Sequence, residues 1–150
     1  MQFLDWEPPT LAEQRETVTE HLRQDERWPG YGCFAAASPA GEVLGWFALT
    51  VRDRPEVPDL AYRLHRRYWG QGLATEGALA LIRYAFTSLG VQAVEADTTA
   101  VNQASRRVMA KCGLTYVRTS HEDFDDPLPG TEQGELLYRI TRAQWVERAD

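Results

Sequence analysis

Apolar and polar residues recur along this chain with two different periods, and these periods predict its helices and strands. Apolar residues spaced three to four positions apart predict a long helix over Ala74–Leu89, ended by Gly90. A second helix is predicted over Asn102–Cys112, and a threonine cap predicts another from Thr10 to about Arg27. Short apolar runs bounded by turn residues predict strands over Cys33–Ala37, Val43–Val51, Leu60–Leu64, Val91–Thr98, Thr115–Ser120 and Glu135–Thr141.

The order of these elements predicts a single domain of the α/β (α+β) class. From Leu60 onward the order is strand, helix, strand, helix, strand, strand, which is typical of a mixed sheet flanked by helices. The two earlier strands, joined by the turn Ser38–Glu42, form a hairpin. A length of 150 residues with 43% hydrophobic composition suits one domain over residues 1–150 with a workable core.

Composition argues against several classes of protein. No stretch approaches 18 consecutive apolar residues, and the N-terminus lacks the basic region and apolar run of a secretory signal. The two cysteines, Cys33 and Cys112, and the three scattered histidines show no metal-ligand spacing. We therefore expect a cytoplasmic protein with free thiols, no metal site and no contact with a membrane.

The net charge of −6 is unevenly distributed. Six acidic residues and no Lys or Arg lie between Thr119 and Tyr138. Cations gather instead in two groups, which are Arg63, Arg66 and Arg67 and Arg106, Arg107 and Lys111. This polarity suits an anionic cofactor on one side and a cationic acceptor on the other, although a solvated acidic loop and ordinary surface arginines explain it equally well. The acidic balance disfavours nucleic-acid binding.

The turn between the strand Leu60–Leu64 and the long helix carries the main functional signal. Gly70 and Gly72 let backbone N–H groups approach an anion, and the helix start adds the positive end of a dipole. A phosphate-bearing ligand is therefore expected here. A dinucleotide fingerprint would need a third glycine where Thr75 stands, but Glu95 and Asp97 lie near the position of its acidic residue, so this alternative stays open.

Two segments resemble the GNAT family of N-acetyltransferases. Trp69-Gly70-Gln71-Gly72-Leu73-Ala74 matches that family's loop motif, Gln/Arg-x-x-Gly-x-Gly/Ala, except at its first position. The tryptophan there, and the run from Asn102 through Ser105 to Lys111-Cys-Gly-Leu, are similar to the RimJ/RimL-like branch, which includes ribosomal-protein N-terminal acetyltransferases. The resemblance implies the GNAT fold, a coenzyme-binding core over residues 60–114 and acetyl-CoA as the donor.

The same resemblance implies that the family's usual first strand and first helix would precede residue 3, so this chain is expected to lack them. The strand Cys33–Ala37 would then form an exposed edge of the sheet. Exposed edges invite pairing with another copy, which favours a homodimer.

The resemblance also assigns contacts with the coenzyme. Leu64 and its neighbours are expected to part from the next strand, leaving backbone groups that pair with the pantetheine arm and polarise the thioester. Asn102 is expected to bond the same arm, although as a helix N-cap it needs no further role. The pyrophosphate is expected on the backbone N–H groups of Gln71, Gly72, Leu73, Ala74 and Thr75.

Acyl transfer also needs an acid for the leaving thiolate and, for some acceptors, a base. Ser105 would lie near the thiol and is the candidate acid, with Tyr116 and Tyr138 as alternatives. A lysine amine is neutral in only about 1 part in 2,500 at pH 7 and needs a base, whereas an α-amine is roughly a tenth neutral and needs little more than a water path.

The candidate bases are carboxylates near the donor. Glu95 and Asp97 share one strand and therefore one face of the sheet. Asp59, which precedes the central strand, and His121 are further candidates. A solvated pair or an ion pair with nearby arginines would explain Glu95 and Asp97 without catalysis.

These features predict an acetyltransferase that works by direct attack of an amine in a ternary complex. The acceptor could be a protein N-terminus or a small amine. One alternative is a non-catalytic module that binds acyl-CoA. Another is transfer of a larger acyl group such as succinyl, for which Arg63 is the obvious cation near the thioester.

Overall fold

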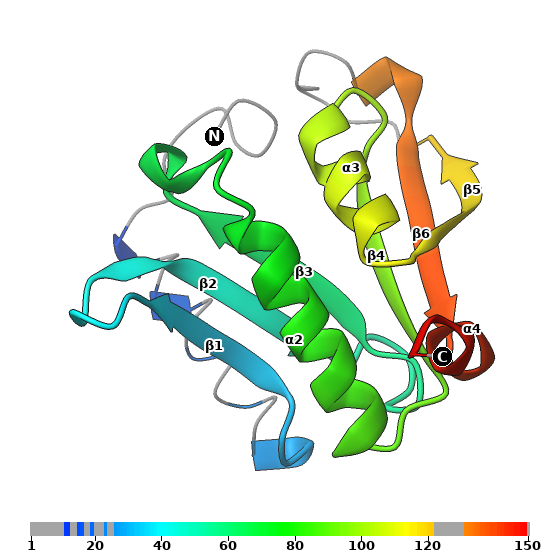
Figure 1. Ribbon diagram of the computed structural model, residues 1–150, viewed down its shortest axis with the longest axis horizontal. Coiled ribbons are helices and arrows are strands. Elements are labelled where there is room, and N and C mark those ends of the chain that lie inside the picture. Colours follow the sequence, from blue (N-terminus) through cyan, green and yellow to red (C-terminus); the bar gives the residue numbers. More distant parts are fainter. Residues whose placement is uncertain are drawn as a thin grey trace.

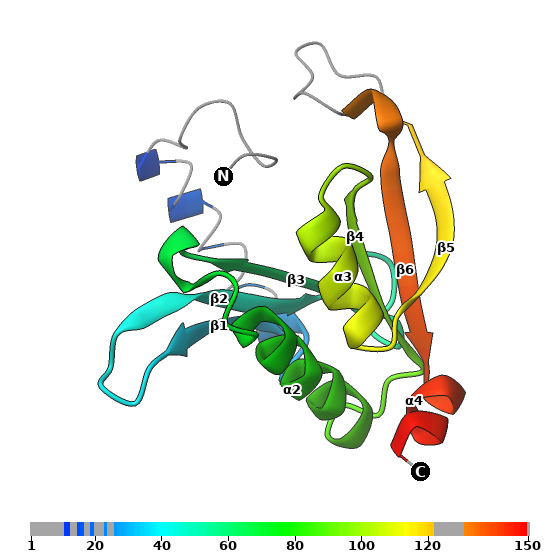
Figure 2. The ribbon, with the colours of Figure 1, turned by 45° about the horizontal axis from the view of Figure 1, so that its top comes forward.

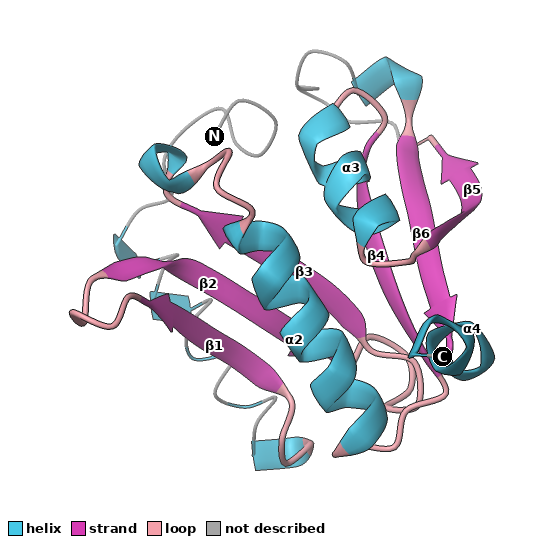
Figure 3. Ribbon diagram, viewed as in Figure 1, coloured by secondary structure: helices cyan, strands magenta, loops and turns pink. Residues whose placement is uncertain are grey.

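The computed structural model describes residues 26–121 and 131–149, together with positions 11, 12, 15, 16, 19 and 23. A six-stranded sheet forms the centre, with the strand order β1-β2-β3-β4-β6-β5 (Figures 1 and 3). The strands are β1 (Gly32–Ala37), β2 (Val43–Thr50), β3 (Asp59–Leu64), β4 (Ala93–Thr99), β5 (Thr115–Ser120) and β6 (Glu135–Thr141). The α-helices are α2 (Leu73–Thr87), α3 (Gln103–Lys111) and α4 (Arg142–Ala149), and short 3₁₀ turns occupy Arg66–Tyr68 and Thr131–Gln133.

The predicted α/β class and the mixed, mostly antiparallel sheet are confirmed. β3 and β4 form the parallel pair, whereas the other neighbours in the sheet pair antiparallel. The predicted element ends agree with the observed ones to within two residues. Within the predicted helix from Thr10 to Arg27, each described position is helical, and its remaining residues lie outside the described ones.

Helix α4 was not predicted from the sequence. It follows β6 without a break, and its Trp145 ring stacks on Phe86 of α2 with centroids 5.0 Å apart. Arg142, at its first position, donates to the Phe86 carbonyl at the end of α2 and to the Val91 carbonyl that follows the helix. The helix therefore closes one end of the core, although its short stretch shows little apolar periodicity.

Helices α2 and α3 cover the same face of the sheet, α2 over β2 and β3 and α3 over β4 and β6 (Figures 1 and 2). Side chains alternate between the two faces along a strand, so every second residue meets the helices. On β4 these are the fully buried Val94 and Ala96. Asp59, Glu95 and Asp97 consequently belong to the opposite face. No described helix is long and apolar enough to cross a membrane.

β1 forms one edge of the described sheet, as expected for the strand predicted at Cys33–Ala37. Its Phe34 side chain is 39% exposed. The homodimer inferred from this edge stays a prediction.

Helix α2 lies close to β2 because Gly77 presents no side chain. A Cβ at this position would overlap the ring of Phe47 on β2. Glycine in a helix interior usually costs about 1 kcal/mol relative to alanine, so this contact needs a compensating gain. The gain is the close approach of helix and sheet, which also fixes where α2 begins.

We expect Gly77→Ala to lower the melting temperature. In an uncrowded helix the change would stabilise by about 1 kcal/mol, but overlap with Phe47 should reverse the sign and destabilise by about 1–3 kcal/mol. Thermal unfolding followed by circular dichroism measures the difference. Ala80→Ser, on the exposed side of α2, serves as control and should change stability by a few tenths of a kcal/mol. A higher melting temperature for Gly77→Ala would contradict this packing.

Candidate functional site

The site is built around a gap in the middle of the sheet. β3 and β4 pair at one position, Asp59 with Glu95, and then diverge (Figure 1). The backbone of His65 bonds to β2, and that of Pro58 bonds to β4. Because successive residues of a strand turn their backbone groups to opposite sides, Tyr62 directs its N–H and C=O into the gap. The separation expected from the family resemblance is therefore present, and it leaves backbone groups available for a ligand.

A glycine-containing turn that precedes α2 lies at the wide end of this gap. Gly70 and Gly72 both have positive φ, at 74° and 78°, which strongly favours glycine. Gly72 is the N-cap of α2, no side chain caps this end, and the first helical bond runs from Glu76 to the Gly72 carbonyl. The N–H groups of Leu73, Ala74 and Thr75 thus point out of the helix start, where an anion would be stabilised.

Trp69 connects the turn to the end of β3. Its indole Nε1 donates to the carbonyl of Leu64 at 2.9 Å, and the Arg66 guanidinium lies 5.9 Å from its ring centroid. The Leu64 carbonyl, expected to be open to the coenzyme, is therefore occupied by this bond. Gln71 bonds weakly back to the Arg67 carbonyl at 3.4 Å.

Helix α3 brings Ser105 to the gap. Asn102 is the N-cap, and its side-chain oxygen accepts from the Ser105 backbone N–H at 3.1 Å, which confirms the capping role. The Ser105 hydroxyl lies 3.2 Å from the hydroxyl of Tyr62, so a hydrogen bond links α3 to β3. Burial raises the pKa of the Tyr62 hydroxyl above its usual value. Tyr62 was not among the residues predicted from the sequence, although a tyrosine between Leu60 and Leu64 places a hydroxyl on the helix-covered face.

The other two tyrosines proposed as acids are less well placed for that role. The Tyr138 hydroxyl accepts from Arg106 Nε at 3.3 Å. Tyr116 is 56% exposed on β5, and its hydroxyl bonds to Thr119 at 2.7 Å.

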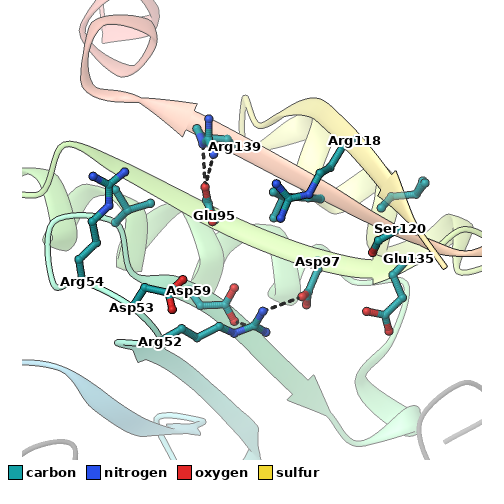
Figure 4. Close-up of a pocket in the computed structure, with 13 residues that line it drawn as sticks. Arg52, Asp53, Arg54, Asp59, Glu95, Asp97, Arg118, Ser120, Glu135 and Arg139 are labelled. Atoms are coloured by element: carbon teal, nitrogen blue, oxygen red, sulfur yellow. Dashed lines mark hydrogen bonds and ion pairs between the residues drawn. The ribbon is translucent and has the colours of Figure 1, made fainter. Parts of the chain in front are cut away.

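On the opposite face of the sheet, charged side chains line a cavity of about 380 Å³ (Figure 4). Arg52 bridges two carboxylates, with Asp59 at 3.1 Å and Asp97 at 3.0 Å. Glu95 forms an ion pair with Arg139 through both Nε, at 2.8 Å, and Nη2. Glu95 and Asp97 do share a face, as predicted, but each is held by an arginine. The remaining charged residues of the lining are Asp53, Arg54, Arg118 and Glu135.

Asp59 is the most perturbed carboxyl of this cavity. Burial raises its pKa to about 7, the charges of Asp97 and Glu95 act in the same direction, and Arg52 opposes them. Its side chain is 11% exposed. Near pH 7 the Asp59 carboxyl is therefore ionised in about half of the molecules, which suits a group that accepts and releases a proton. Asp59 also belongs to the single residue pair at which β3 and β4 meet.

The other predicted groups lie elsewhere. His121 is exposed at the end of β5 and does not line the cavity. Arg67 pairs with Glu42 at 2.8 Å, and Arg63 lies over the ring of Trp46 at 5.8 Å. Four of the six acidic residues counted between Thr119 and Tyr138 lie outside the described residues. Among the described residues, no group of three or more His, Cys, Asp or Glu side chains could hold a metal ion.

Comparison with known proteins decides between the two ligand classes left open by the sequence. A family model described as an acetyltransferase (GNAT) domain matches residues 1–115. The chain belongs to the GNAT acetyltransferase family. The donor of this family is acetyl-CoA, and solved GNAT acetyltransferases contain coenzyme A. A dinucleotide fold is not supported, because it requires a doubly wound parallel sheet and this sheet has one parallel pair.

One relative is the FsC-acetyl coenzyme A-N(2)-transacetylase of Aspergillus fumigatus. It is 41% identical to this GNAT chain over 126 residues, which cover 79% of the chain and 53% of the relative. Two further relatives from Bacillus subtilis are covered to 62% and 59% of their length. The chain therefore spans between half and two thirds of the length of these three relatives.

Two solved structures share the fold. The ribosomal L7/L12 alpha-N-protein acetyltransferase RimL, in complex with coenzyme A, has a TM-score of 0.78 at 19% identity, with 93% of this chain and 78% of that chain covered. The Vibrio cholerae spermidine N-acetyltransferase, in complex with CoA and spermine, has a TM-score of 0.76 at 15% identity, with 93% and 79% covered. At these identities the likeness establishes the fold alone.

The raised pKa of Asp59 predicts a pH-dependent stability. In the unfolded chain an aspartate has a pKa of about 3.9, so between about pH 4 and pH 7 the folded state binds more protons. The free energy of unfolding should therefore fall as the pH rises through this window, by an amount on the order of 4 kcal/mol. Asp59→Asn should remove this contribution and exceed the wild type in stability at pH 8.

Denaturant unfolding at pH 5, 6, 7 and 8 measures the effect. Asp53→Asn is the control, because it removes a negative charge from an exposed residue of the loop that precedes β3. Equal pH dependence in the wild type and Asp59→Asn would show that Asp59 ionises normally.

Proposed function

We propose that this GNAT chain carries the active site of an acetyl-CoA-dependent N-acetyltransferase that transfers an acetyl group directly to a primary amine. The observation that supports this most strongly is the coincidence of three features in one gap. Unpaired backbone groups line it, an anion-binding turn lies at its wide end, and a carboxyl with a pKa of about 7 stands where it begins.

The residues around the gap fit the coenzyme. The N–H groups of Leu73, Ala74 and Thr75, with the turn of Gln71 and Gly72, would hold its pyrophosphate. The gap would take the pantetheine arm along β3. When bound, acetyl-CoA supplies an activated acyl group. The Tyr62 N–H that faces the gap is available to an oxyanion developing on that group, a contact typically worth about 3 kcal/mol.

Leu64 and Asn102 support the coenzyme site less directly. Leu64 directs its N–H into the gap, while its carbonyl is held by Trp69. The Asn102 oxygen caps α3, which leaves its amide N–H₂ as the group that could bond a ligand.

Two proton transfers are assigned to residues on opposite faces of the sheet. Asp59, rather than Glu95 or Asp97, is the base that takes a proton from the amine, because its partners leave its pKa near 7. As the nitrogen–carbon bond forms and the carbon–sulfur bond breaks, the leaving thiolate takes a proton from Ser105. Tyr62, hydrogen-bonded to Ser105, can replace that proton.

Direct transfer is favoured because Cys112 is a poor nucleophile. Its side chain is 1% exposed, and burial raises the pKa of its thiol to about 11. The reactive thiolate is therefore rare at neutral pH, and no acyl-cysteine step is needed. Cys112 instead closes the contact between α3 and α2, where its thiol lies 3.8 Å from the Thr75 carbonyl.

The finer assignment is to the RimJ/RimL-like branch, with a small amine or a protein N-terminus as acceptor. The loop motif beginning at Trp69 and the fold of RimL support the branch. Names of relatives support both acceptor types, since one relative acetylates an N(2) nitrogen, RimL a protein and a third protein spermidine. A dodecameric spermidine N-acetyltransferase supports self-association, for which the β1 edge is the candidate surface.

Coenzyme binding is the first property to test. Isothermal titration with acetyl-CoA should give a micromolar dissociation constant, and Gly72→Glu should abolish it by adding bulk and a like charge at the phosphate site. Gly90→Glu is a matched control at the other end of α2, since both glycines have positive φ and open space around the missing Cβ. Equal losses in both variants, or no binding by the wild type, would overturn the proposal. Binding without thiol release from any amine would indicate the non-catalytic module instead.

The pH dependence of turnover tests the base. With saturating acetyl-CoA, kcat/KM for the amine should rise with pH and level off above about pH 7, as Asp59 loses its proton. Asp59→Asn should lower kcat/KM by roughly a hundredfold and remove the inflection. Asp97→Asn is the comparison, because it should keep an inflection while shifting its position. An unchanged profile in Asp59→Asn would exclude Asp59 as the base.

A further inference from the structure

The sheet face opposite α2 and α3, called the open face below, holds the cavity of Figure 4. Positive and negative side chains are nearly balanced in the lining of this cavity. Four arginines and five carboxylates line it, and three of the carboxylates form ion pairs with Arg52 or Arg139. With Asp59 about half protonated at pH 7, the lining as a whole is close to neutral. A polycation gains less from such a surface than from an acidic one, since three of the five carboxylates already pair with arginines. The cavity therefore suits a ligand that carries both signs of charge.

Two arginines of the lining remain available to an anion. Within the described residues, neither Arg54 nor Arg118 has a hydrogen bond or ion pair to its guanidinium. Arg118 extends from β5 toward the carboxylates of β4 (Figure 4). A guanidinium can bind a carboxylate through two parallel hydrogen bonds, which gives both strength and orientation.

The sheet register sets the distance between the two kinds of charge. Asp97 pairs with Leu137, and Leu137 pairs with Arg118, so the three residues lie on one rung across β4, β6 and β5. Two strand spacings separate the backbones of Asp97 and Arg118 by about 10 Å. Arg118 reaches from β5 toward β4, whereas Asp97 turns its carboxylate to Arg52 beside Asp59 (Figure 4). A ligand that contacts Arg118 and these carboxylates together therefore needs to be only a few bonds long. Asp59, the assigned base, is joined to Asp97 through Arg52.

We propose that this cavity receives an acceptor in which the reactive amine and an anionic group are one or two carbons apart, as in a 2-amino acid. The ammonium enters at Asp59 and Asp97, and the carboxylate pairs with Arg118. This substrate class rests on the acetyltransferase function proposed above. It distinguishes the chain's acceptor from a polyamine, which has no anionic group, and from a protein N-terminus, where an amide follows the amine.

Arg118 is thus a specificity-determining residue rather than part of a structural ion-pair network. A structural role would require a carboxylate partner, as Arg52 and Arg139 have, and none is present for Arg118 among the described residues. Its side chain also lies on the edge strand β5, where it contributes little to the buried core. Its removal should therefore affect ligand selection and leave folding intact.

The test compares ligands that differ only in the anionic group. Leucine, leucinamide and 3-methylbutylamine share one side chain and one amine, and glutamine and ornithine with their amides extend the comparison. Spermidine represents the polyamines. Calorimetric binding is measured with coenzyme A present, which permits no transfer, and kcat/KM is measured separately by thiol release from acetyl-CoA.

We expect the wild type to bind at least one 2-amino acid about tenfold or more tightly than its amide, the strength expected of a charge-assisted contact. Arg118→Gln should weaken binding of the amino acid alone, so that the acid and its amide bind with equal dissociation constants. Arg118→Lys should retain part of the preference for the acid. Arg83→Gln, an exposed arginine on α2 at the other face of the sheet, is the control and should keep the full preference.

The binding arm separates this inference from the proposed function. A carboxylate preference that depends on Arg118, without turnover, would support the cavity assignment and overturn the transferase. Turnover of spermidine or leucinamide as efficient as that of the amino acids would support the transferase and overturn the acceptor class. Absence of binding by every 2-amino acid, or equal losses for acid and amide in Arg118→Gln, would also overturn it.

Discussion

The structure depends on one interruption in the hydrogen bonding of its sheet. β3 and β4 are the parallel neighbours, and they pair at Asp59 and Glu95 before separating. Because backbone groups without partners are costly when buried, the groups that β3 turns into this gap favour a ligand that would pair with them. α2 packs over β2 and β3 on one side of the gap and α3 over β4 and β6 on the other, and the two helices meet at Cys112 (Figure 1). The hydroxyl bond between Tyr62 and Ser105 joins the two halves across it.

Asp59 shows how the same constraint produces reactivity. Standing at the point where the strands part, its side chain is mostly buried, yet the cavity next to it prevents complete enclosure. Arg52 supplies enough positive charge to keep the carboxyl from being permanently protonated, and Asp97 shares that arginine. This balance leaves the pKa of Asp59 near 7, so ionisation of its carboxyl lowers the free energy of unfolding. A group useful for moving a proton at neutral pH is therefore one that the fold tolerates rather than favours.

The sequence predicted those features that depend on neighbouring residues. The period of α2, the turn at Gly70 and Gly72 and the Asn102 cap are local, and each was found where expected. It did not reveal α4, whose place depends on stacking against Phe86. Nor did it identify the roles of Tyr62, Arg52, Arg118 and Arg139. These residues acquire their partners, or their lack of one, only when strands distant in sequence take their order in the sheet. For the same reason it ranked Glu95 and Asp97 above Asp59, since their arginine partners come from β6 and from the loop after β2.

The two faces of the sheet at the gap differ in polarity. In the proposed transfer this difference favours approach of the donor from one face and of the acceptor from the other. On the helix-covered face the residues nearest the gap are uncharged hydroxyl and apolar groups, together with the N–H groups at the start of α2. On the open face they are paired charges around Asp59. An anionic donor is favoured by the N–H groups at the start of α2, whereas an ammonium is favoured by Asp59 and Asp97 on the open face. In the proposed reaction the two reactants approach from opposite faces and meet in the space between β3 and β4. In the function proposed above, proton acceptance and proton donation are assigned to Asp59 and Ser105 on opposite faces of the sheet, so the base and the acid occupy different environments within one small site.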